Sequence, residues 1–208
     1  MKCFFTLLLS ILSFHLFAQD DMLNDLMKTQ DTSTSLLPNK MLFTQRIFWG
    51  EHGLMRGVHP LTPINREKEL KLRRGMLVTH QVLGFVTLGG MVAQGVVGAK
   101  LYNASGRSAG NLRNIHEGLG AAVNLTYSTT AFMSLFTPPP LINRDRKISS
   151  IRIHKWLAVV HMSGMIATNV LAGMIQDSPN RNQLRSLHRA AAYTTFASFG
   201  AAVIAIKF

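Results

Sequence analysis

Four apolar segments dominate the second two thirds of the chain. They cover residues 75–101, 114–136, 153–175 and 187–206, and each reaches the length of about twenty residues that a helix needs to cross a bilayer. A backbone inside lipid must satisfy its own hydrogen bonds, so each segment is expected to be a helix. The loops between them are short and rich in Pro, Gly and Asn, which makes consecutive helices antiparallel neighbours. The sequence predicts an all-α membrane protein, an up-down four-helix transmembrane bundle over 75–208.

The composition supports a membrane protein and limits its chemistry. The chain is 47% hydrophobic and only 15% charged, yet its formal net charge is +12. The basic residues lie between the apolar segments, where they would meet phospholipid headgroups or an acidic cofactor, and this placement argues against nucleic-acid binding. Cys3 is the single cysteine, so a cysteine-based metal or iron–sulfur site is excluded and metal binding would use histidine.

The residues before the first apolar segment divide into three parts. Residues 1–18 carry Lys2, an apolar run and a small residue at the end, as a signal peptide does; an uncleaved short anchor is the alternative. Residues 19–40 form a polar leader. Residues 41–74 predict an amphipathic helix lying at the membrane surface, then a turn with two prolines and a charged approach. We expect the inner membrane of a bacterium, with this region on the exported side.

The charges of the loops favour the opposite orientation. Eleven Lys and Arg residues lie at the end of the bundle that the signal would export, against six at the other end. The positive-inside rule would place the richer end in the cytoplasm. The signal peptide and the loop charges thus predict opposite orientations, and the orientation stays open.

The apolar segments contain residues that are costly in a lipid-facing helix. Gln94, Asn124 and Asn169 are examples of the polar ones, and eleven glycines are spread over the four segments. Glycine is useful in a membrane helix where something must come close to the backbone. Both features predict a bundle packed around a buried group.

A histidine recurs near the start of each segment, as in an internal repeat. The spacings are 36, 38 and 34 residues, nearly one histidine per helix and loop. In an up-down bundle, the first and third of these histidines lie on one side of the membrane and the second and fourth on the other. Helices one and three are diagonal, as are two and four, so each pair can face inward. The repeats read HQVLGF from His80, HEGLGA from His116, HKWLAV from His154 and HRAAAY from His188.

Two imidazoles that face each other among glycines are what a bis-histidine haem b requires. The iron takes one nitrogen from each side, and the propionates benefit from nearby cations. For a single histidine the simpler interpretation is a helix cap or a headgroup contact, but four in register favour coordination. The cations near these histidines are Arg74, Arg113, Arg152, Lys155 and Arg189.

This pattern resembles the cytochrome b561 and ferric-reductase transmembrane family. SSIRIHKWLAVV is similar to the family's Leu-His-x-Trp-Leu-Gly helix opening, and LRSLHRAAAY to its next histidine-bearing helix. The resemblance covers about 75–206 and implies two haems b on opposite sides of the membrane. It implies His80 with His154, and His116 with His188, as iron ligands. The family also has a helix on either side of this core and an ascorbate site, and neither is recognisable here.

His161 is an alternate ligand. It lies one heptad after His154, on nearly the same helix face and about 10 Å further along the axis. His80 follows Arg74 by six residues and His161 follows Lys155 by six, so matching depths alone would pair these two. The fourfold repeat and the family resemblance favour His154.

These features predict a membrane-embedded b-type cytochrome. An iron with two protein ligands has no position left for oxygen or substrate, so such haems exchange electrons. The expected function is electron transfer between an unknown donor and an unknown acceptor on opposite membrane faces. We expect no catalytic residue. The expected partners are the lipid bilayer and either a second copy, in a possible homodimer, or a larger complex. The alternatives are a small transporter with a histidine-lined path and a structural subunit. Glu117 is the only acidic residue in the segments, which argues against the transporter.

Overall fold

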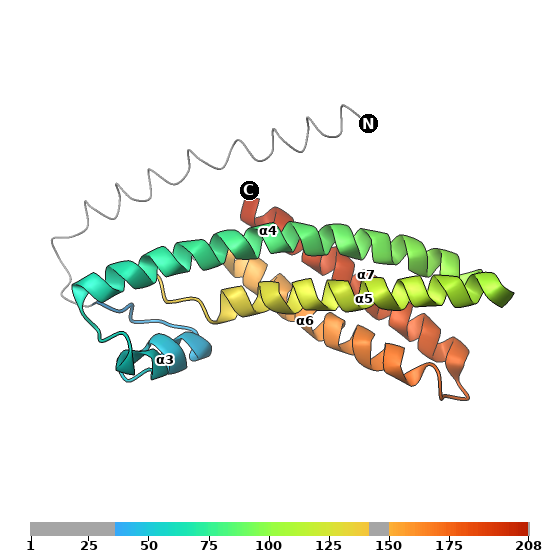
Figure 1. Ribbon diagram of the computed structural model, residues 1–208, viewed down its shortest axis with the longest axis horizontal. Helices are drawn as coiled ribbons and strands as arrows, with labels where there is room; N and C mark the ends of the chain where they lie inside the picture. The colour runs from blue at the N-terminus through green and yellow to red at the C-terminus, as the bar shows by residue number, and fades with distance from the viewer. Residues whose placement is uncertain (1–35, 142–149, 208) are drawn as a thin grey trace, which may run out of the picture. The chain divides into compact units, whose positions relative to one another are not determined.

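The computed structural model describes residues 36–141 and 150–207, and all the regular structure in this part of the chain is helical (Figure 1). The predicted signal peptide at 1–18, Cys3 and most of the polar leader lie outside the described residues. The elements are α3 (Phe43–Trp49), the short 3-10 helix η1 (Leu54–Gly57), α4 (Pro63–Tyr102), α5 (Gly106–Leu135), α6 (Ser150–Met174) and α7 (Arg181–Lys207).

Three of the helices, α4, α6 and α7, are long and apolar enough to cross a membrane. The all-α prediction is therefore confirmed, and the chain is a membrane protein. The fourth predicted span corresponds to α5, which has 30 residues but does not reach the same hydropathy. Its polar residues, Asn124 and the Thr and Ser residues after it among them, account for the difference.

The long helices form two antiparallel hairpins (Figure 1). Helices α4 and α5 pack side by side as the first hairpin, and α6 and α7 as the second, with a smaller contact between α4 and α7. Glycine allows the close approach within each hairpin. A Cβ atom at Gly90 would lie 2.9 Å from a methyl group of Val123, and one at Gly164 would overlap the hydroxyl of Thr195.

The region expected to be an interfacial helix and a separate charged approach has a different layout. Helix α3 has only seven residues, and the charged residues after Pro63 are part of α4. The helix starts here because Thr62 caps it, accepting a hydrogen bond from the backbone N–H of Asn65 at 3.3 Å, and because proline is favoured in a first turn. An exposed ion pair between Glu67 and Lys71, at 2.7 Å, adds local support.

A proline segment, residues 136–140, connects the end of α5 to the start of α4 through hydrogen bonds. Proline has no N–H group, so this segment offers mainly carbonyl acceptors, and α3 and α4 supply the donors. This network fixes α3 and the start of α4 against the end of α5. Trp49 Nε1 donates to Phe136 O at 2.9 Å, Arg73 to Pro138 O at 2.6 Å, and Arg66 to Pro139 O at 2.6 Å and Pro140 O at 3.1 Å.

The same corner contains a buried ion-pair network. Glu69 accepts hydrogen bonds from Arg66, at 2.7 Å, and from Arg56 of η1. The side chains of Arg66 and Glu69 are both only 2% exposed. Because each charge is paired and hydrogen-bonded, the network is tolerated away from water.

Candidate histidine-pair site

The structure brings together the same histidines that the sequence repeat pairs. The rings of His80 on α4 and His154 on α6 have centroids 6.1 Å apart and planes at 82°. The rings of His116 on α5 and His188 on α7 have centroids 6.3 Å apart and planes at 73°. Each pair therefore joins one helix of the first hairpin to one helix of the second.

Three of these imidazoles are anchored through Nδ1 to a backbone carbonyl of the neighbouring helix in the same hairpin. A carbonyl oxygen only accepts, so Nδ1 must carry the hydrogen and Nε2 the lone pair. This second contact is typical of metal-binding histidines, because it fixes the tautomer and the orientation of the ring. The contacts are His80 to Thr130 O at 2.8 Å, His154 to Ala202 O at 2.9 Å and His188 to Thr168 O at 3.0 Å.

The carbonyl acceptors follow a simple spacing that the sequence analysis missed. Each lies fourteen residues, or two heptads, after the histidine of its own helix: 116 to 130, 188 to 202 and 154 to 168. Residues two heptads apart lie on nearly the same helix face. The corresponding residue on α4 is Gln94, which contacts His116 in another way, through a side-chain amide that donates to the His116 carbonyl at 2.9 Å. This spacing was the signal that could have predicted the anchors.

Glycine provides space or close contact beside each pair. Gly84, one turn after His80, is buried, yet a Cβ atom there would meet no atom within 4 Å. Gly98 allows close contact instead, because a Cβ atom there would lie 3.0 Å from Cε1 of His116. The ring of His116 therefore lies directly against the backbone of α4.

The donor set fits a haem b at each pair. Two imidazole nitrogens about 2 Å from one iron, on opposite sides, place the ring centroids about 6 Å apart, and the observed distances are 6.1 and 6.3 Å. Over the residues that the structure describes, no group of three or more His, Cys, Asp or Glu side chains could hold a metal ion. A pair of imidazoles suits an iron whose remaining ligands come from a macrocycle. The empty space beside Gly84 lies one helical turn from His80.

The alternate ligand, His161, has a different set of contacts. Its Nδ1 atom lies 2.8 Å from the hydroxyl oxygen of Tyr127 on α5. Its ring packs against Tyr127 and against Phe199 of α7. The structure therefore places His154, and not His161, in ring contact with His80.

The five predicted cofactor-binding cations differ in their surroundings. Arg189, next to His188 in the sequence, stacks on Tyr102 with its guanidinium carbon 4.1 Å from the ring centroid, and lies 6.0 Å from the centroid of Tyr193. This cation is held close to the second pair. The other four, Arg74, Arg113, Arg152 and Lys155, are exposed, and only Arg152 and Lys155 lie in the first two turns of their helix.

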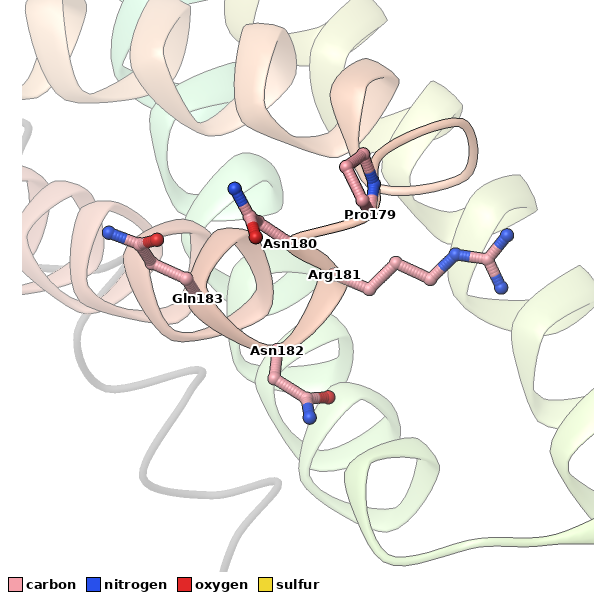
Figure 2. Close-up of a pocket in the computed structure, with 5 residues that line it drawn as sticks. All are labelled: Pro179, Asn180, Arg181, Asn182 and Gln183. Atoms are coloured by element: carbon pink, nitrogen blue, oxygen red, sulfur yellow. The ribbon is translucent and has the colours of Figure 1, made fainter.

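A hollow of about 520 Å³ at the turn between α6 and α7 is a separate feature (Figure 2). Its lining comes from five consecutive residues, and Figure 2 shows the side chain of Arg181 extending away from those of Asn180 and Gln183. The polar groups do not converge, so this hollow does not add to the histidine site. The lining residues are Pro179, Asn180, Arg181, Asn182 and Gln183.

No protein-family description, curated protein or solved structure matches this chain. The functional assignment therefore depends on the chain's own residues and their geometry.

Proposed function

We propose that this chain is a membrane-embedded b-type cytochrome that carries electrons across the membrane. His80 and His154 would hold one haem b, and His116 and His188 a second. The observation that carries the proposal is the pair of facing imidazoles, which recurs with centroids 6.1 and 6.3 Å apart. A bound bis-histidine haem supplies reversible one-electron exchange with no coordination position open to substrate.

The chain's residues would orient the ligands before any metal binds. The carbonyls of Thr130 and Ala202 accept from the Nδ1 atoms of the first pair, so both Nε2 atoms keep their lone pairs. A hydrogen bond of this kind also raises the basicity of the imidazole. Each Nδ1 hydrogen bond joins the two helices of one hairpin. The Nε2 atoms would therefore bind the iron between the two hairpins.

The positions of the two pairs suit opposite sides of a bilayer. His80 and Gly98, against which the ring of His116 lies, are eighteen residues apart on α4, about 27 Å along a helix axis. The hydrocarbon core is about 30 Å thick, so each pair would lie inside it, near one surface. A donor at one face and an acceptor at the other would then exchange electrons with different pairs.

Helix α5 would cross the membrane with the other three. It packs along α4, and its polar side chains are largely satisfied without water. Thr126, Thr129 and Thr130 donate to carbonyls one turn earlier on α5, and hydrogen bonds of this kind lower the cost of placing hydroxyl groups in lipid. The proposed fold is therefore a four-helix transmembrane bundle with two sites between its hairpins.

The transporter and structural-subunit alternatives have less support from the geometry. A permease for metal ions would use transient clusters of ligands, whereas the histidines here form two separate pairs. A purely structural subunit would not require three histidines to share the same anchoring contact.

Reconstitution into sealed vesicles tests the proposal. The vesicles would contain ferricyanide, which does not cross the bilayer, and dithionite would be added outside. We expect haem b bands in the reduced spectrum and oxidation of the external reductant only when protein is present. His80→Ala should abolish the electron flow, and His52→Ala, a change at an exposed histidine outside both pairs, should not. Purified, folded protein that contains no haem and binds none when haem is added would contradict the proposal.

A further inference from the structure

One further imidazole, outside the two pairs, lies buried among aromatic rings. His161 of α6 is 8% exposed, Tyr127 of α5 is 7% exposed and Phe199 of α7 is 4% exposed. The ring centroid of His161 is 5.7 Å from that of Tyr127 and 5.0 Å from that of Phe199. This aromatic cluster (Tyr127, His161 and Phe199) joins three helices and both hairpins.

The cluster lies along the chain close to the first pair. Tyr127 is three residues before Thr130, which anchors His80, and Phe199 is three residues before Ala202, which anchors His154. His161 itself is seven residues after His154 on nearly the same face of α6. Among the residues that the structure describes, His161 is therefore the buried imidazole that could compete with His154 for the site it shares with His80.

The hydrogen-bond partners of His154 and His161 differ in a chemically decisive way. His154 donates from Nδ1 to a carbonyl, which leaves a lone pair on Nε2. His161 Nδ1 meets a hydroxyl group at 2.8 Å instead. When the hydroxyl donates to Nδ1, the imidazole hydrogen is on Nε2, and that nitrogen has no lone pair for a metal.

We infer that Tyr127 selects His154 over His161 as the second ligand of the His80 site. It does so by donating its hydroxyl hydrogen to Nδ1 of His161, which places the imidazole hydrogen on Nε2, while Phe199 packs against the ring. Tyr127 is a positioning residue in this account, since it touches neither iron nor substrate. The inference rests on the proposed function and deepens it, because it names the residue that decides between two possible ligand sets.

Three variants test the inference: Tyr127→Phe, His161→Phe and the double variant. The readouts are haem b per chain and the electron paramagnetic resonance spectrum of the oxidised protein, which reports the ligands of each low-spin iron. We expect His161→Phe to keep two haems with the spectrum of the parent protein. We expect Tyr127→Phe to add a new low-spin species at one site only, because His161 can then compete. The double variant should lose that species, since the competing imidazole is gone.

Several results would overturn the inference. Loss of one haem in His161→Phe would identify His161 as the ligand. His161→Leu is the control, because it shows whether the introduced phenyl ring itself displaces the haem. A Tyr127→Phe spectrum identical to the parent's would show that Tyr127 selects nothing. A changed spectrum that persists in the double variant would show a packing effect. A parent protein without haem would instead overturn the proposed function, and this inference with it.

Discussion

The hydrogen bond on one ring nitrogen separates four histidines of the apolar helices into two kinds. His80, His154 and His188 donate from Nδ1 to carbonyl oxygens, whereas His161 meets a hydroxyl group. The sequence shows that all four lie in apolar helices, but it does not show which atom faces each ring. In the proposed assignment, the anchored histidines differ from His161 through contacts between helices, and these contacts depend on how the helices pack.

Glycine next to a histidine gives the first prediction. Gly84→Leu fills space beside His80 in which a Cβ atom would meet no other atom, and we expect it to remove the haem of the first pair only. Gly98→Val drives a side chain against the ring of His116 and should remove the haem of the second pair only. Haem quantification on purified variants gives one haem per chain in each case.

Gly89→Leu is the matched control for both changes. Gly89 lies on α4 at an exposed position, and a Cβ atom there also meets no atom within 4 Å. This variant should keep both haems. Loss of haem in Gly89→Leu, or two haems in Gly84→Leu, would show that the space beside His80 is not part of a binding site.

At the scale of the helices, the sequence predicts the long elements well and the corner at the start of α4 poorly. Apolar length and the histidine repeat predict all four helices, but three of them begin well before the predicted spans: α4 at Pro63 instead of 75, α5 at Gly106 instead of 114 and α7 at Arg181 instead of 187. Hydropathy does not detect the early start of α4, because charged residues such as Arg66 and Glu69 are typical of a loop. Their burial depends on Arg56 and on the proline segment some seventy residues away, which no local pattern reveals.

The buried ion-pair network gives a second prediction. Glu69→Gln removes the charge that Arg66 and Arg56 share, and leaving a buried cation without its partner typically costs about 3–5 kcal/mol. We expect a loss of this order in the free energy of unfolding, measured by denaturant titration in detergent with circular dichroism.

Glu67→Gln serves as the comparison for Glu69→Gln. Its ion pair with Lys71 has side chains 67% and 77% exposed, and exposed pairs contribute about 0–1 kcal/mol. Equal losses in the two variants would mean that the network at Glu69 does not hold the corner together.

For the whole molecule, the contact between the two hairpins is the main feature. Within a hairpin the helices pack closely, whereas the strongest contact between hairpins joins only α4 and α7. Polar links add to it: Tyr127 bonds to His161, and Asn124 and Asn169 exchange amide hydrogen bonds at 2.7 and 2.9 Å. The sequence predicts which helices are neighbours and which histidines face each other, but not the hydroxyl and amide contacts that link the hairpins.

This arrangement predicts that haem stabilises the folded protein. A ligand that binds only the folded state at one hundred times its Kd adds about 2.7 kcal/mol. Protein produced without haem should therefore unfold at a lower temperature than the same protein reconstituted with haem, in circular dichroism melts. The His80→Ala/His116→Ala variant should gain nothing from added haem. Equal melting temperatures with and without haem in the parent protein would contradict this expectation.

The pairing of histidines is the central claim, and haem content in double variants tests it most directly. His80→Ala, His154→Ala and the combination of both should each retain one haem b per chain, because all three changes damage the same site. His80→Ala combined with His116→Ala should retain none, because it damages both sites. One haem in the second combination, or none in the first, would contradict the pairing of α4 with α6 and of α5 with α7.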